Sequence, residues 1–174
     1  MIIRDATERD VAGIANLHAE SWRASYRGVL SDEYLENNVI RDRLAVWQAR
    51  YSVATCKPMF VLVAEARSEL TGFACVFPNE DDVFGSFLDN LHVSPLLTGH
   101  GIGKQLLSEA ARRLITSASH AGLHLWVVDQ NKRARQFYER AGAVVVNSSE
   151  NLMPDGQRVK ALRCCWNDLG TLLR

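Results

Sequence analysis

The chain has 174 residues, a length that suits one domain with a sizeable core, so we expect residues 1–174 to form a single domain. Its 20 basic and 20 acidic residues give a formal net charge of zero, which argues against nucleic acid as a partner because nucleic-acid-binding proteins normally carry a basic surplus. No run of about 18 apolar residues occurs, and the start Met1–Asp5 is charged too early for a signal peptide, so we expect no membrane span and no export.

The N-terminal half is predicted to contain strands and two helices. Thr7 is a suitable N-cap because the acids Glu8 and Asp10 follow it in the first turn. In chain order the elements are a strand over 2–6, a helix after Thr7, an aromatic and basic stretch over 21–28, a helix from Ser31, a hairpin of 59–67 with 70–78 turning at Ser68-Glu69, an acidic loop over 79–85 and a strand over 86–93.

The C-terminal half is predicted to alternate helices with strands. Residues 123–128 are nearly all apolar, as in a central strand that is buried on both faces. The other elements are a helix over 103–117 whose inward residues are Leu106, Leu107, Ala110, Leu114 and Ile115, a helix over 131–141, and strands over 144–147 and 158–166 around a Pro154-Asp155-Gly156 turn. This order predicts an α/β (α+β) fold with helices on both faces of a mixed sheet, in which a right-handed crossover makes strands 86–93 and 123–128 parallel.

The four cysteines, at positions 56, 75, 164 and 165, form no C-x-x-C pair. We interpret them as small buried hydrophobic residues of a reducing compartment, which favours a cytoplasmic protein. No His/Cys spacing typical of a metal site occurs, so we expect neither a zinc site nor a metal cofactor.

Three glycines alternate at positions 99, 101 and 103, between a predicted strand and a predicted helix. Glycine permits a positive φ and lets a ligand approach bare N–H groups, and the helix N-terminus behind it adds free donors and partial positive charge. The turn therefore predicts a phosphate site. A P-loop would need glycine at Thr98 and Ser or Thr at Gln105, and a dinucleotide fingerprint would need glycine at Lys104, so neither pattern fits.

This segment resembles the acetyl-CoA-binding motif of the GNAT superfamily of N-acetyltransferases. Leu91–Val93 (Leu-His-Val) matches the apolar-x-Val end of the family's fourth strand, and Gly101–Lys104 matches the turn that opens its helix. Thr98 departs from the pattern, because the family usually has Gln or Arg there as a pyrophosphate contact. The rest of the chain follows the family order of elements, so the resemblance covers nearly all of it.

A second and independent match lies near the C-terminal helix. Asn131, Ala134, Tyr138 and Gly142 follow the family pattern N-x-x-A-x-x-x-Y-x-x-x-G without a gap. Asn131 is also a preferred helix N-cap, and both roles are compatible. Tyr138 has an alternative interpretation as a core aromatic residue, since it shares a helix face with Ala134.

The resemblance implies a mostly antiparallel mixed sheet of about seven strands, splayed between the fourth and fifth strands after a bulge and flanked by four helices. It implies acetyl-CoA as cosubstrate, with the pantetheine paired to the strand at Leu91 and Val93 as an added strand would be. The residues that it assigns to the cofactor are Leu91, His92, Val93, Thr98, Gly99, His100, Gly101, Ile102, Gly103, Lys104, Asn131 and Tyr138.

The resemblance also implies the chemistry. Tyr138 would protonate or hydrogen-bond the departing CoA thiolate, and with a thiol pKa near 8.5 against a phenol near 10 full proton transfer is roughly balanced. The amine would attack the thioester directly in a ternary complex, because no cysteine nucleophile lies near the motif. The alternative function is a non-catalytic acyl-CoA-binding sensor or interaction module on the same fold.

The general base is not identified by the family motifs, because the positions where some relatives carry it are apolar in this sequence. The places where some relatives carry a carboxylate are Phe87 and Trp126 here, so Asp89, at a position where other relatives have a histidine base, is the candidate. Asp89 should share a strand face with Leu91 if the alternation holds. Asp129 is the alternative base, and His92 is interpreted as a packed strand residue.

The acceptor is expected to be a small-molecule or peptide amine. Trp22 and Tyr26 lie where the family places its acceptor site, although Trp22 is equally compatible with the core. The acidic loop Glu80–Asp82 offers electrostatic steering of a cationic amine, with plain solvation as the alternative. A homodimer is compatible with these features.

Overall fold

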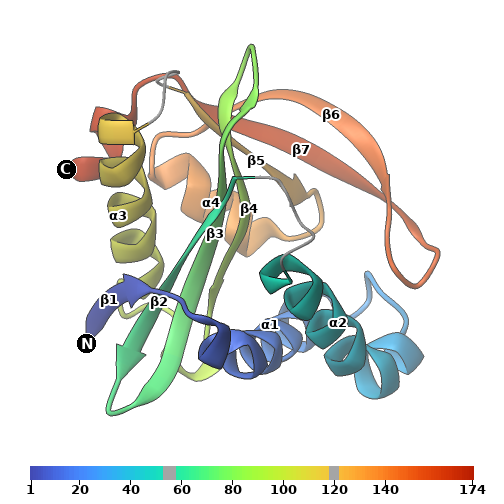
Figure 1. Cartoon of the computed structure of the whole chain (residues 1–174). Helices are drawn as coiled ribbons and strands as arrows, with labels where there is room; N and C mark the ends of the chain where they lie inside the picture. The colour runs from blue at the N-terminus through green and yellow to red at the C-terminus, as the bar shows by residue number, and fades with distance from the viewer. Residues whose placement is uncertain (53–57, 118–121) are drawn as a thin grey trace.

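The computed structural model describes residues 1–52, 58–117 and 122–174, which form one seven-stranded sheet in the order β1-β2-β3-β4-β5-β7-β6 (Figure 1). The strands are β1 (Ile2–Asp5), β2 (Phe60–Ala66), β3 (Glu69–Asp81), β4 (Gly85–Val93), β5 (Leu123–Val128), β6 (Val144–Leu152) and β7 (Arg158–Trp166). Every neighbouring pair is antiparallel except β4 and β5, which are parallel. The predicted mixed sheet is confirmed.

In the described part of the chain, four α-helices cover the sheet, two on each face (Figure 1). They are α1 (Val11–Ser25), α2 (Val39–Tyr51), α3 (Ile102–Ser117) and α4 (Lys132–Arg140), and a π-helical turn (Tyr34–Asn38) precedes α2. Alternate residues of β2 serve the two faces: Val61 and Val63 pack with α1 and Trp47 of α2, whereas Leu62 and Ala64 pack with α3. No helix among the described residues is both long and apolar enough to cross a membrane.

The entry to α1 is tied to the sheet edge by charged side chains. Asp10 accepts hydrogen bonds from the Thr7 backbone N–H at 2.7 Å and from the Arg4 guanidinium at 2.8 Å, and Arg4 also donates to Glu65 at 2.9 Å. Thr7 therefore caps the helical segment as predicted, although the first turn (Glu8–Asp10) is a 3-10 helix. This cluster joins β1, β2 and the start of α1.

Some boundaries differ from the predictions. Strand β3 continues to Asp81 and pairs with β4 again at Gly85, so most of the predicted acidic loop is hairpin. The β2–β3 turn falls on Arg67 and Ser68, both at positive φ. Strand β6 runs to Leu152, well past residue 147. Ile115 is 52% exposed and lies on the outer side of α3, so its predicted inward position is wrong.

The sheet divides between β4 and β5. Their pairing is limited to Ser86 with Leu123 and Phe87 with His124, after which the strands diverge. On its other side, β4 shifts register against β3, because Val76 pairs with Leu88 and Cys75 with Asn90. Asp89 is the extra residue of this bulge, which lies where the two halves of the sheet separate.

Candidate active site

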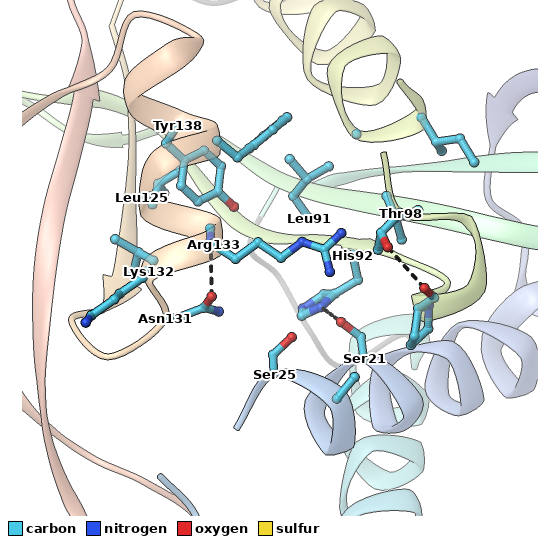
Figure 2. Close-up of a pocket in the computed structure, with 18 of the residues that line it drawn as sticks. Ser21, Ser25, Leu91, His92, Thr98, Leu125, Asn131, Lys132, Arg133 and Tyr138 are labelled. Carbon is cyan, nitrogen blue, oxygen red and sulfur yellow. Dashed lines mark hydrogen bonds between the residues drawn. The ribbon is translucent and has the colours of Figure 1, made fainter. Parts of the chain in front are cut away.

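A cleft of about 650 Å³ lies in the division between β4 and β5 (Figure 2). Its walls come from the C-terminal half of α1, from β4 and the glycine turn behind it, from β5 and from the start of α4. Most of the predicted cofactor residues line it: Leu91, His92, Val93, Thr98, Gly99, Gly101, Ile102, Gly103, Lys104, Asn131 and Tyr138.

The glycine turn presents the N-terminus of α3 to this cleft. Gly99 and Gly101 have φ values of +89° and +80°, a conformation that L side chains rarely adopt. The first helical hydrogen bond runs from the Gln105 N–H to the Gly101 carbonyl at 3.0 Å, so the N–H groups just before it have no helical acceptor. Gly103 has no positive φ, and a Cβ there would make an ordinary contact with the Phe137 ring at 3.5 Å, so this position does not require glycine. The arrangement suits an anion.

Tyr138 lies in the wall of the cleft that α4 forms. It is 9% exposed, and its ring lies against Phe137 and Trp166 with centroid separations of 5.2 and 6.0 Å. Figure 2 shows its hydroxyl directed into the cleft. Burial raises the pKa of this phenol above its usual value, and the nearby Tyr26 raises it further, so the group stays protonated at neutral pH.

Asn131 and Tyr26 bring α1 and α4 together across the cleft. Asn131 caps α4 by accepting the Ala134 N–H on Oδ1 at 3.1 Å, as predicted, and it also lines the cleft. Tyr26 is the C-cap of α1. Burial raises the pKa of Tyr26, and its hydrogen bond with the Asn131 side chain opposes that rise. Asn131 is thus both the N-cap of α4 and part of the cleft wall.

Asp89 lines the cleft but does not share a face with Leu91. Its Oδ2 contacts Arg50 of α2 at 2.5 Å and also accepts a hydrogen bond from the Asn90 side-chain amide. Leu91 and Val93 pack with the α3 side of the sheet. The prediction of a common face was wrong, because the bulge at Asp89 interrupts the alternation on which it depended.

His92 lies on the α1 side of β4. Its Nδ1 is 2.8 Å from the Ser21 hydroxyl oxygen, and its ring lies 4.4 Å from that of His18 and 5.2 Å from that of Phe73. The ring packs as expected for a strand residue and also forms part of the cleft wall. Burial, with a smaller effect of Arg43, lowers the pKa of His92 to about 3.

Three predicted functional residues lie outside the cleft wall. Trp22 is 9% exposed and packs in a cluster with Tyr34, under the Arg43 guanidinium at 4.3 Å from its ring. His100 is exposed, with Nδ1 3.2 Å from the Leu97 carbonyl oxygen. Asp129, the alternative base, is paired with Arg135 at 2.5 Å. None of the three belongs to the cleft-lining residues that the structure describes.

The cleft also contains residues that the motifs did not indicate. Ser21 and Ser25 lie one helical turn apart on α1, and Figure 2 shows the Arg133 side chain extending from α4 into the cleft. Arg133 was recoverable from the sequence, since it follows the Asn131 cap by two residues at a helix start that the motif already located. The serines were not, because nothing local distinguishes them from other polar residues of α1.

Three side chains away from the cleft form a cluster that could hold a metal ion, although the sequence led us to expect no metal site. Ligand atoms of Glu80, Asp81 and His124 lie within 4.8 Å of one another. The Asp81 carboxylate already accepts the backbone N–H groups of Val83 and Phe84 at 2.8 and 2.9 Å, and its other oxygen is 3.3 Å from Arg163. We therefore assign Asp81 to the β3–β4 turn and assign no ion to the group.

Comparisons with known proteins identify a family and relatives. The acetyltransferase (GNAT) family matches residues 12–143. The uncharacterized N-acetyltransferase YuaI of Bacillus subtilis (strain 168) is 26% identical over 172 residues, which cover 98% of this chain and 95% of YuaI. The spermidine N(1)-acetyltransferase of Thermoplasma acidophilum is 27% identical over 145 residues, which cover 80% of this chain and 86% of that enzyme.

A solved structure shows the same fold. The PaiA N-acetyltransferase of Thermoplasma acidophilum, crystallised in complex with coenzyme A, has a TM-score of 0.66 at 24% sequence identity. The match covers 92% of this chain and 96% of that one, so the likeness extends over nearly the whole of both molecules.

Proposed function

This chain belongs to the acetyltransferase (GNAT) family, and from that premise we propose that it transfers the acetyl group of acetyl-CoA to a primary amine by direct attack in a ternary complex. The observation that carries the proposal is the cleft itself. It places an anion-binding helix N-terminus and a buried, protonated Tyr138 hydroxyl on the two sides of one division in the sheet.

The cofactor would occupy the cleft from the glycine turn inward. The N–H groups over residues 101–104 suit the pyrophosphate, and the basic residues Lys104, Lys132 and Arg133 also line the cleft. The β4 edge at Leu91 and Val93 has no β5 partner, which leaves it able to pair with the amides of pantetheine. The related PaiA enzyme was crystallised in complex with coenzyme A, which supports coenzyme A as the kind of ligand.

Acetyl transfer then requires that the leaving thiolate be stabilised and that the amine lose a proton. The amine nitrogen bonds to the thioester carbon, the carbon–sulfur bond breaks, and the sulfur leaves with its electron pair. Tyr138 faces the cleft as the group to stabilise that thiolate. Because burial raises the phenol's pKa while a free thiol has a pKa near 8.5, we propose that Tyr138 acts mainly as a hydrogen-bond donor.

The attacking amine must also lose a proton. Asp89 is the acidic residue that lines the described cleft, and we propose that its carboxylate receives this proton directly or through water. Its contacts to Arg50 and to Asn90 both use Oδ2, so Oδ1 is the oxygen that we assign to the proton. Arg50 fixes the carboxylate at the bulge, beside the place where the strands diverge.

The reaction is assigned to the cytoplasm, as expected from the sequence. Cys75, Cys164 and Cys165 are buried and unbridged, which fits a reducing compartment, while Cys56 lies outside the described residues.

Tyr26 remains a proposed acceptor contact, because it lines the cleft, whereas Trp22 supports it from the packed cluster below.

The test is free-thiol release from acetyl-CoA with a panel of amines, with mass detection of the products. Thiol release together with an acetylated amine supports the proposal. Calorimetry with CoA on the same sample decides the alternative: tight CoA binding without acetylation of any amine would identify a non-catalytic acyl-CoA-binding protein. The panel should include monoamines, polyamines, aminoglycosides, amino acids and a peptide with a free N-terminus.

A further inference from the structure

Ser21 and His92 form a polar pair in the cleft wall across from Tyr138 (Figure 2). Ser21 belongs to α1 and His92 to β4, and the hydroxyl oxygen of Ser21 lies 2.8 Å from Nδ1 of His92. Although the resemblance placed His92 among the cofactor residues, the placement proposed above pairs the cofactor with the β4 edge at Leu91 and Val93 and uses neither the Ser21 nor the His92 side chain. A pair of hydrogen-bonding groups fixed by two elements in a ligand cleft is a candidate for substrate contact.

The packing behind the pair holds the imidazole ring in place. The ring of His92 packs against those of His18 and Phe73, which also contact each other. His18 is itself fixed, because its Nδ1 accepts the indole N–H of Trp47 at 3.0 Å and its remaining proton is therefore on Nε2. A ring held by such contacts loses little conformational entropy when it binds a ligand.

The pair can accept an N–H hydrogen bond in either tautomer of His92. If Ser21 donates to Nδ1, its own oxygen keeps lone pairs for the ligand; if Nδ1 donates to Ser21, Nε2 is the acceptor. Since burial keeps the pKa of His92 low, the ring is neutral at pH 6 to 9 and does not repel a cationic amine. An amine nitrogen is the kind of group that this pair suits.

The charges in the cleft restrict the rest of the acceptor. Among the lining residues that the structure describes, Asp89 is the one carboxylate, and it is paired with Arg50. The sequences of 53–57 and 118–121, outside the description, contain no Asp or Glu. A second ammonium group in the cleft would be desolvated with no carboxylate of its own among the described lining residues.

Resting on the proposed acetyltransferase function, we propose that Ser21 and His92 bind the acceptor nitrogen and that the cleft selects monoamines over polyamines. The preferred substrate class is a primary amine with no second cationic centre. The pair holds the nitrogen on the α1 side of β4, and Asp89, on the same strand, is then required for the proton and is not available to a second charge.

The matched substrates for the test are butylamine and 1,4-diaminobutane, which share a four-carbon chain and differ by one ammonium group. We expect kcat/KM to be at least about tenfold higher for butylamine at pH 8, after correction for the neutral fraction of each amine. Equal or better use of the diamine would overturn the inference and leave the acetyltransferase function standing. Acetylation of no amine in any assay would overturn both.

Variants of both residues test the assignment. Ser21→Ala and His92→Leu should each raise the KM for butylamine about tenfold or more while the KM for acetyl-CoA stays unchanged, and His92→Gln, which keeps a neutral hydrogen-bonding group, should recover part of the loss. Ser117→Ala, at the exposed end of α3, is the matched control. An unchanged amine KM in Ser21→Ala, which removes only a hydroxyl, would overturn the assignment even if His92→Leu failed to fold.

Discussion

The Tyr138 hydroxyl is a single group whose removal leaves the surrounding packing in place. Tyr138→Phe keeps the ring against Trp166, so we expect an unchanged melting temperature and unchanged CoA affinity. The value of kcat should fall by about 10- to 10³-fold, because a positioned proton donor acts in the transition state. Steady-state kinetics and calorimetry measure the two effects, with Tyr51→Phe, outside the cleft, as control. A wild-type kcat, with chemistry shown to limit turnover, would return Tyr138 to a packing role.

The role of Asp89 is tested by the pH dependence of its variant. Asp89→Asn should lower kcat/KM most near neutral pH, and the loss should shrink as the pH approaches the pKa of the substrate amine, since a neutral amine needs no base. A pH–rate profile from pH 6 to 9, with melting curves of both proteins, gives the comparison. If the ratio is flat and the melting temperature falls, Asp89 only anchors Arg50 of α2.

Single residues were predictable from the sequence where the signal is local. Tyr138 and Asn131 lie seven residues apart on one helix and its cap, so spacing identifies both. The Ser21–His92 pair joins residues 71 positions apart, which no window of sequence contains. Trp22 shows the opposite case: its aromatic and basic neighbours suggested a binding surface, but the apolar ring is more stable under Arg43 in a packed cluster.

At the level of elements, the N-terminus of α3 is the proposed phosphate site. Gly101→Asp should abolish measurable CoA binding, because the new carboxylate would stand at the anion position and the residue would be strained at φ +80°. Gly101→Ala carries the same backbone strain without the charge and is the control, since a Cβ there meets only Gln105 Nε2 at 3.9 Å. Calorimetry separates them. Unchanged affinity in a folded Gly101→Asp protein would remove the pyrophosphate from this turn.

The pattern of apolar residues was sufficient for most elements and insufficient at irregularities. Strand β5 begins and ends at the predicted residues, because a strand buried on both faces is an unbroken apolar run. Strand β4 was located but its faces were misassigned past Leu88, since one extra residue reverses the alternation. The end of β3 was missed because a two-stranded extension beyond the core needs no apolar pattern.

The whole molecule should lose stability in acid through Asp10. Arg4 holds the pKa of the Asp10 carboxyl well below its usual range, so the group stabilises the fold above the unfolded pKa of about 4 and loses that contribution as the pH falls below it. Asp10→Asn should therefore cost about 1–2 kcal/mol of unfolding free energy at pH 7 and less at pH 3. Urea denaturation at both values measures this, with the exposed neighbour Glu8→Gln as control. An equal cost at both pH values would contradict the ion-pair explanation.

Two residue pairs join β4 to β5 in the described structure, so the two parts of the sheet are hydrogen-bonded to each other over a short stretch. A ligand that pairs with β4 and also contacts β5 would clamp the two halves, and by linkage it would stabilise the native state by about 2.7 kcal/mol at a hundredfold excess over its Kd. Amide hydrogen exchange should then slow on CoA binding at Leu91 and Val93, where β4 has no β5 partner, and change little at Val63, within the paired part of the sheet. The cofactor would in this way add contacts between the two parts of one sheet at the place where the direct pairing of β4 and β5 ends.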